Sequence, residues 1–149
     1  MNCEEKIREH LKDALKQHDG ARVSILRLLL SEIKKAEIAQ RTPLDDNKIL
    51  DVIGTEVKRH RESIEAFKQG NRSDLVAQEE AELSILMGYL PKQMSREEVV
   101  TVAQQAIGAV GAKGISDKGK VMSQLMPKLR GKADGKEVSD VVSELLTNL

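Results

Sequence analysis

The chain has 149 residues, the length of one average domain or of two very small ones. Its 24 basic side chains equal its 24 acidic ones, so no whole-chain field indicates a nucleic acid or a membrane surface as partner. One Phe, one Tyr and no Trp argue against sandwiches and barrels, and against folds that stack bases on aromatic side chains.

Apolar side chains recur every three or four residues along four successive segments of residues 1–90, which predicts four amphipathic helices. Gly20 and Gly70 are expected to end the first and third helices, and Asn71 or Ser73 to cap the fourth. The predicted ranges are 4–18, 21 to about 40, the Asp45/Asp46 pair to about 69, and about 73–90.

The pattern changes at Pro91, which lacks a backbone donor and ends the fourth helix. Ser95 and Glu98 form a capping box for a fifth helix to about 108. Six of the ten glycines then fall between 108 and 135, which predicts two further short helices with flexible joints. We therefore expect an all-α protein, with an N-terminal bundle of about four helices (1–90), a hinge at 90–94 and a small three-helix C-terminal domain (95–149).

The start of the chain and its longest apolar cluster bear on location. The first ten residues are charged where a secretory signal peptide needs an apolar run, and the apolar cluster at 25–30 is far shorter than a bilayer span. The single cysteine, Cys3, cannot form an internal disulfide. These features predict a cytoplasmic protein without a membrane partner.

Local signals for catalysis are few. The sequence has no phosphate-binding glycine loop, no nucleophile elbow and no zinc-spaced Cys/His cluster. His60 falls on the apolar side of the third helix with Glu56 one turn earlier, but no histidine has the Glu-x-x-His spacing of di-iron bundles. We expect a half-buried His60 bonded to a neighbour, and no catalytic residue, metal ion or cofactor.

Charge is concentrated near the end of the chain. Residues 113–136, the basic segment, hold seven basic side chains and two acidic ones. Such a cluster can neutralise several phosphates of an RNA, although a lysine-rich helix surface can also be ordinary solvated surface. The candidate RNA-binding residues are Lys118, Lys120, Lys128, Arg130, Lys132 and Lys136.

The stretch GKVMSQLMPKLRGKADGKEVSDVVSELL (119–146) closely resembles the terminal signature of the YqeY family, the stand-alone relatives of the tail of the aminoacyl-tRNA amidotransferase subunit GatB. The stretches at 11–38, 56–75 and 79–95 resemble other blocks of the same family, in the same order. The tail positions that match the family motif are Gly119, Lys120, Met122, Pro127, Lys128, Gly131, Asp134 and Gly135.

This resemblance implies an all-helical N-terminal domain followed by a small helical domain. In GatB the related tail is associated with holding tRNA, while amide transfer occurs elsewhere. The expected function is therefore a non-catalytic RNA-binding module whose partner is tRNA or another structured RNA. Two alternatives stay open: a scaffold for a protein partner, and an accessory component of carbon–nitrogen ligase activity with glutamine as amido-N-donor, the label commonly attached to the family.

Overall fold

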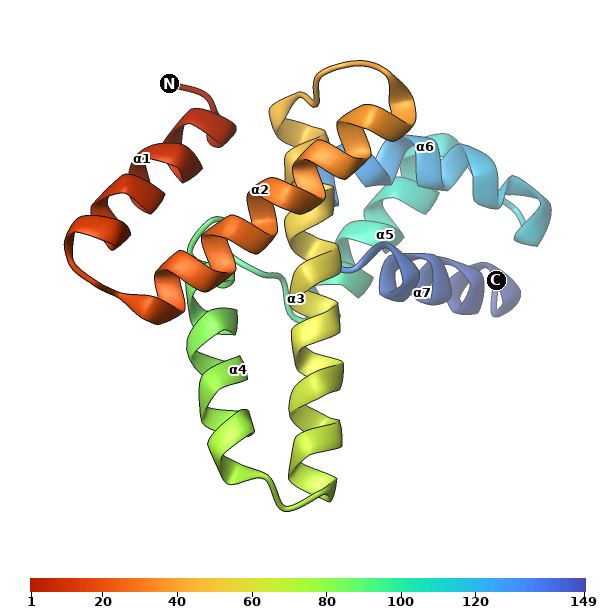
Figure 1. Cartoon of the computed structure of the whole chain (residues 1–149). Coiled ribbons are helices and arrows are strands. Elements are labelled where there is room, and N and C mark those ends of the chain that lie inside the picture. The colour runs from red at the N-terminus through yellow and green to blue at the C-terminus, as the bar shows by residue number, and fades with distance from the viewer. The chain divides into compact units, whose positions relative to one another are not determined.

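The computed structural model describes residues 1–149 and contains seven α-helices, one short 3-10 helix and no β-strand (Figure 1). The all-α prediction is confirmed. Contacts along the chain define two compact units, Met1–Leu90 and Pro91–Leu149, called the N-terminal and C-terminal units below. That each folds as an independent domain, with a hinge at 90–94, stays a prediction.

Four helices build the N-terminal unit: α1 (Cys3–Lys16), α2 (Gly20–Gln40), α3 (Asp46–Gln69) and α4 (Ser73–Met87). Helix α1 packs on α2, and α3 packs along α4, to which a short turn joins it (Figure 1). Their apolar stripes bury a common core, as the three-and-four spacing predicts. Its buried members are Ile7, Ile25, Leu26, Leu29, Ile33, Ile49, Ile53, Val57 and Leu86.

Side-chain caps and left-handed residues set the helix ends in this unit. The predicted Asp45/Asp46 pair opens α3, and Asp45 is the cap, because its carboxylate accepts the amide of Lys48. Gly20 does not end α1: His18 takes the left-handed conformation, with φ of 55°, and Gly20 is already the first residue of α2. The expected cap of α4 is also wrong, since Arg72 occupies the cap position without a side-chain bond.

The C-terminal unit contains α5 (Arg96–Val110), the 3-10 helix η1 (Ile115–Asp117), α6 (Lys118–Leu129) and α7 (Gly135–Thr147). Helix α5 contacts both α6 and α7, which also contact each other. The Ser95 half of the predicted capping box is confirmed, because Ser95 Oγ accepts the amide of Glu98; the Ser95 hydroxyl also donates to the Glu98 carboxylate at 3.3 Å. The core comprises Val99, Ala103, Ala106, Ile107, Val121, Leu125, Leu129, Val138, Val141, Val142 and Leu146.

None of the helices combines the length and the hydropathy that crossing a membrane requires.

Candidate functional site

The basic segment lies on α6, on the loop after it and on the start of α7. Lys118, Lys120 and Lys128 belong to α6, Arg130 is its C-terminal cap, and Lys136 is the second residue of α7. Lys120, Lys128, Arg130 and Lys136 are exposed, whereas Lys118 and Lys132 are half-buried. The fold thus brings the six predicted residues onto one short stretch of surface structure, but it gives them unequal access to a partner.

Helix α6 arranges two of these cations in line. Lys120 and Lys128 are eight residues apart, so they lie on the same exposed side, about 12 Å apart along the helix axis. The same helix carries a fully buried stripe of Val121, Leu125 and Leu129, spaced four residues apart. The apolar stripe therefore fixes which lysines face solvent.

The carboxylates of the basic segment are largely occupied by backbone amides. Asp117 Oδ2 accepts the amide of Lys113 at 2.9 Å, and Asp134 Oδ1 accepts that of Lys136 at 3.4 Å. The one ion pair of these lysines is loose, with Lys120 Nζ 3.9 Å from Asp117 Oδ1. Lys128, Lys132 and Lys136 have no carboxylate within 4.0 Å, so their charge is free to act on a partner.

The loop between α6 and α7 is held by residues that sequence reasoning did not single out. Gln93 Nε2 donates to the Gly131 carbonyl at 2.7 Å, and the amide of Met94 donates to the Lys132 carbonyl at 2.8 Å. Gly131 has φ of 78°, a conformation that favours glycine. The signal that could have pointed to this turn was Gly131 itself; its partner segment is 38 residues away.

The remaining motif residues have mixed roles. Met122 is half-buried against the core, and Gly135 lies beside Met126. Asp134 caps α7. Pro127 and Gly119 are exposed on α6, and a Cβ on Gly119 would meet nothing within 4 Å. No packing inside this chain therefore requires glycine at position 119.

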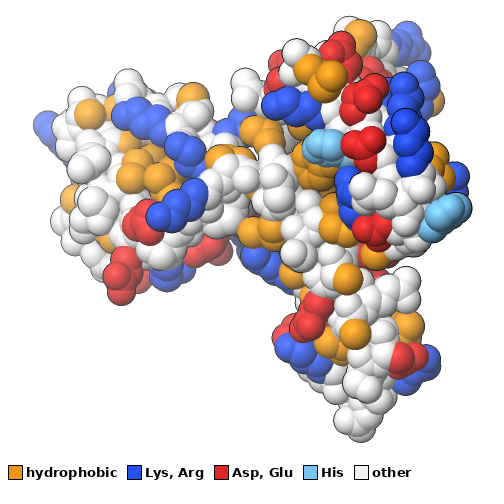
Figure 2. Space-filling model, turned by 90° about the vertical axis from the view of Figure 1, so that its left-hand side faces the viewer, with side chains coloured by type: hydrophobic (Ala, Val, Ile, Leu, Met, Phe, Trp, Pro, Cys, Tyr) orange, Lys and Arg blue, Asp and Glu red, His pale blue; other side chains and the backbone are white.

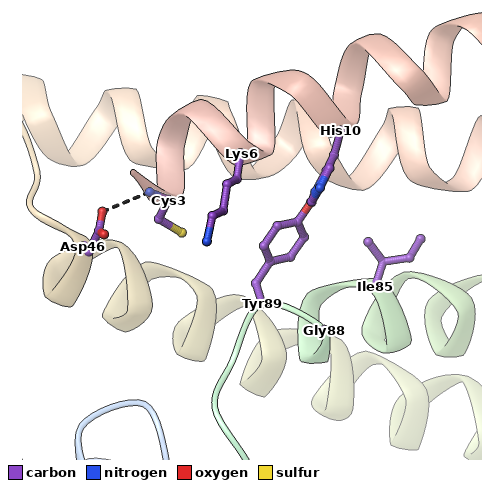
Figure 3. A pocket seen from close by; sticks show the side chains of 7 residues that line it. All are labelled: Cys3, Lys6, His10, Asp46, Ile85, Gly88 and Tyr89. Atoms are coloured by element: carbon purple, nitrogen blue, oxygen red, sulfur yellow. Dashed lines mark hydrogen bonds between the residues drawn. The ribbon is translucent and has the colours of Figure 1, made fainter. Parts of the chain in front are cut away.

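A second candidate region is an open pocket of about 400 Å³ in the N-terminal unit, between α1, the start of α3 and the end of α4. Lys6 extends into it between Cys3 and Tyr89, and His10 Nδ1 is hydrogen-bonded to the Tyr89 hydroxyl (Figure 3). The Cys3 amide donates to Asp46 Oδ1 at 3.1 Å, which anchors the start of α1.

The Cys3 thiol and the Tyr89 phenol of this pocket both have a raised pKa. Partial burial, joined by the nearby Asp46 carboxylate, raises the pKa of the Cys3 thiol above its usual value. Burial likewise raises the pKa of the Tyr89 phenol. Because the thiolate is the nucleophile, a raised pKa is unfavourable for nucleophilic chemistry by Cys3 at neutral pH.

His60 is the third candidate: the prediction that it bonds to a neighbour is confirmed, but the side chain is buried and not half-buried as expected. Its side chain is 7% exposed; Nδ1 donates to the Glu56 carbonyl at 2.9 Å, and Nε2 lies 2.9 Å from Glu82 Oε2. Glu79 Oε2 lies 3.5 Å from the same nitrogen. Burial lowers the pKa of His60, but the bonds to Glu82 and to the Glu56 carbonyl, with the charges of Glu79 and Glu82, raise it above its ordinary value.

Surface charge in the N-terminal unit is mixed. On the face drawn in Figure 2, basic and acidic side chains lie beside one another. Arg59 pairs with Glu56 at 2.7 Å and with Glu32 at 3.7 Å, and Arg8 pairs with Glu4 at 3.0 Å. Such pairs cancel much of the local field, in contrast to the basic segment.

Several fungal proteins are similar to this chain. The chain is 26% identical over 144 residues to "Altered inheritance of mitochondria protein 41, mitochondrial" of Pyrenophora tritici-repentis, which covers 95% of this chain and 79% of the relative. It is 40% identical over 85 residues to the protein of the same name from Lachancea thermotolerans; the match covers 56% of this chain and 46% of that relative. It is 31% identical over 94 residues to an uncharacterized protein of Schizosaccharomyces pombe; the match covers 63% of this chain and 76% of that relative. The chain thus spans less than half the length of the Lachancea relative.

The prediction of a cytoplasmic location is wrong by this comparison, because relatives similar to this chain are named as mitochondrial proteins. The prediction considered only the apolar run of a secretory signal peptide. A charged N-terminus excludes the apolar core of a secretory signal peptide, but mitochondrial targeting depends on an amphipathic, arginine-rich segment instead.

The family comparison covers nearly the whole chain. A sequence model of the YqeY family, described as Yqey-like protein, matches residues 4–146. That range includes the helices of both units except the first residue of α1 and the last of α7, and it includes the basic segment and the His60 cluster. The chain therefore belongs to the YqeY family.

Proposed function

We propose that this chain is a non-catalytic RNA-binding module that holds tRNA through the basic segment of its C-terminal unit. One observation carries the proposal: seven basic side chains occur between 113 and 136, and both acidic ones are engaged by backbone amides. Lysines without carboxylate partners retain their full charge for phosphates, which dominate the affinity of proteins for nucleic acids.

The geometry of α6 supports contact with more than one phosphate. Lys120 and Lys128 lie on one exposed side of the helix, and Lys136 opens the next helix on an exposed position. Gly119 stands between Lys118 and Lys120 with open space where a side chain would be. A partner can therefore approach the backbone of the first turn of α6 closely.

Helix N-termini add little to this interface. The amide of Lys136 already meets the Asp134 carboxylate, which occupies the position that an anion would take at α7. Helix α6 continues directly from η1, whose cap amide bonds to Ile115. We therefore assign phosphate binding to the lysine side chains and not to the helix ends.

The location of the aromatic side chains limits what can be recognised. Phe67 and Tyr89, the two aromatic residues, both belong to the N-terminal unit. The C-terminal unit therefore has no aromatic side chain on which bases could stack. Its RNA contacts are with phosphates, and recognition depends on the shape of the RNA.

The test is a gel shift with bulk tRNA at about 50 mM salt, where phosphate contacts are strong. Wild type is expected to retain tRNA, and Lys120→Glu/Lys128→Glu/Lys136→Glu to lose retention. The matched control is Lys16→Glu/Lys34→Glu/Lys68→Glu, which makes the same change in net charge at exposed positions of the N-terminal unit. The proposal fails if wild type does not shift tRNA, or if both variants weaken binding equally.

The amidotransferase alternative makes a different prediction. If the chain is an accessory component of that activity, it should stimulate conversion of misacylated Glu-tRNA or Asp-tRNA when the other subunits are present. We expect no stimulation, because the proposed module only holds RNA; stimulation lost in the triple-lysine variant would replace our proposal with this alternative.

A further inference from the structure

The buried polar cluster between α3 and α4 combines metal-ligand side chains from two helices. Glu79 and Glu82 are three residues apart on α4, so they project from the same side of that helix. His60 comes from α3, which packs along α4. We propose that His60, Glu79 and Glu82 bind one divalent transition-metal ion of the zinc type.

The distances suit such an ion. Zinc holds imidazole nitrogen at about 2.0–2.1 Å and carboxylate oxygen at about 2.0–2.2 Å, so ligand atoms of a tetrahedral site lie roughly 3.3–3.5 Å apart. His60 Nε2 is 2.9 Å from Glu82 Oε2 and 3.5 Å from Glu79 Oε2. All three ligand atoms lie within 4.8 Å of one another. The His60–Glu82 separation is shorter than this spacing and would have to widen on binding, and three protein ligands leave a fourth position to water.

The charge around the cluster is unbalanced without a further cation. Neither Glu79 nor Glu82 has a lysine or arginine within 4.0 Å; His60 is the one basic side chain that both share. Two arginines flank His60 in the sequence: Arg59 is engaged with Glu56 and Glu32, and Arg61 donates to Met87 Sδ at 3.8 Å. Two carboxylates with one imidazole leave excess negative charge in a buried place, and a divalent ion would neutralise both carboxylates while His60 is neutral.

The surroundings also have features of a metal site. His60 Nδ1 donates to the Glu56 carbonyl, which orients the ring and leaves Nε2 as the ligand. The Glu79 side chain is 22% exposed, whereas that of Glu82 is 8% exposed. Glu79 therefore provides the route from solvent to the cluster and has the freedom to rotate toward an ion.

The ligand set favours zinc over hard cations. Imidazole is typical of zinc, copper, iron and nickel sites, while magnesium and calcium prefer oxygen ligands alone. This proposal departs from the sequence prediction of no metal. That prediction considered the Glu-x-x-His spacing within one helix, and here Glu-x-x-Glu on α4 meets a histidine from α3.

The test uses the full chain without an affinity tag, stripped with a chelator and then dialysed against zinc, with bound metal determined by elemental analysis. We expect about one zinc per wild-type chain and at least about tenfold weaker binding in Glu79→Gln and in Glu82→Gln. Cobalt, used as a spectroscopic probe, should give visible absorption bands in wild type that both variants lose. Magnesium at the same concentration should not compete.

Two control variants separate this site from others. Glu80→Gln changes an exposed carboxylate beside Glu79, and Cys3→Ser removes the thiol of the pocket on α1. Both should bind zinc as wild type does. If Glu82→Gln fails to fold, the more exposed Glu79→Gln decides the outcome. The proposal is overturned if wild type retains no zinc, if Glu79→Gln retains wild-type affinity, or if Cys3→Ser abolishes binding.

Discussion

The N-terminal and C-terminal units place their polar groups in opposite ways. The N-terminal unit buries Glu56, His60 and Glu82 among its helices, whereas every buried side chain of the C-terminal core is apolar. The C-terminal unit instead carries its excess of cations at the surface of α6 and α7. We infer that the first unit is built to hold something small within a helix pair, and the second to present charge to a large partner.

The largest expected effect comes from opening the apolar core of the C-terminal unit. Leu125 is fully buried on α6, the helix that also carries Lys120 and Lys128. Leu125→Ala should lower the free energy of unfolding by about 2–5 kcal/mol, measured by urea denaturation, because it leaves a cavity. It should also abolish tRNA binding under conditions in which the C-terminal unit is unfolded.

Leu86→Ala is the matched change in the N-terminal unit, where Leu86 is equally buried. A similar loss of stability is expected there, with tRNA binding retained below the unfolding transition. If Leu86→Ala abolishes tRNA binding in folded protein, the separation of roles between the units is wrong.

The next effect concerns the turn that orients the basic segment. Gly131 has φ of 78°, and a side chain in the left-handed region costs roughly 1–2 kcal/mol. Gly131→Ala should therefore lower the free energy of unfolding by about that amount in urea denaturation. Gly119→Ala is the contrast, because position 119 is exposed on α6 with nothing within 4 Å. Equal effects of the two substitutions would contradict this account of the turn.

The buried histidine gives the N-terminal unit a pH dependence in metal-free protein. The pKa of His60 is raised from 6.5 in the folded state, so its stabilising interaction with Glu79 and Glu82 is fully present below that pH. It is lost as pH rises through the folded-state pKa. In a chelator, the difference in Tm between wild type and His60→Gln should shrink from pH 5.5 to pH 8.5. A Tm difference between the two proteins that does not change with pH would contradict a stabilising charge interaction of His60 with Glu79 and Glu82.

The smallest effect is a gain in stability at Gly54, in the interior of α3. A Cβ there would meet nothing within 4 Å, so alanine fits without strain. Gly54→Ala should raise the free energy of unfolding by about 0.5–1 kcal/mol in urea denaturation, since alanine has the higher helix propensity. A loss of stability would mean that this surface of α3 is covered in solution.

Features encoded by neighbouring residues could be predicted from the sequence. The Ser95–Glu98 cap and the Asp45 cap depend on residues three apart, and both formed as expected. The end of α3 at Gly70 matched the prediction, whereas the end of α1 did not, because His18 adopts a left-handed conformation two residues before Gly20. Propensity alone does not specify which residue of a short connection takes that conformation.

Features that join distant residues needed the structure. The sequence indicated that His60 is bonded to a neighbour, but Glu82 lies 22 residues away on another helix. Likewise, Gln93 and Gly131 meet across 38 residues. The candidate cations of the basic segment were visible in the sequence because they are clustered there. Their unequal exposure depends on which side of α6 packs inward.

The most direct test of the central claim is the salt dependence of tRNA binding by the full chain, measured by filter binding between about 50 and 200 mM salt. Phosphate contact through the basic segment predicts that log K falls linearly with log salt. The slope should become shallower by about one for each of Lys120→Gln and Lys128→Gln. Binding that does not depend on salt, or a slope that neither substitution changes, would contradict the account.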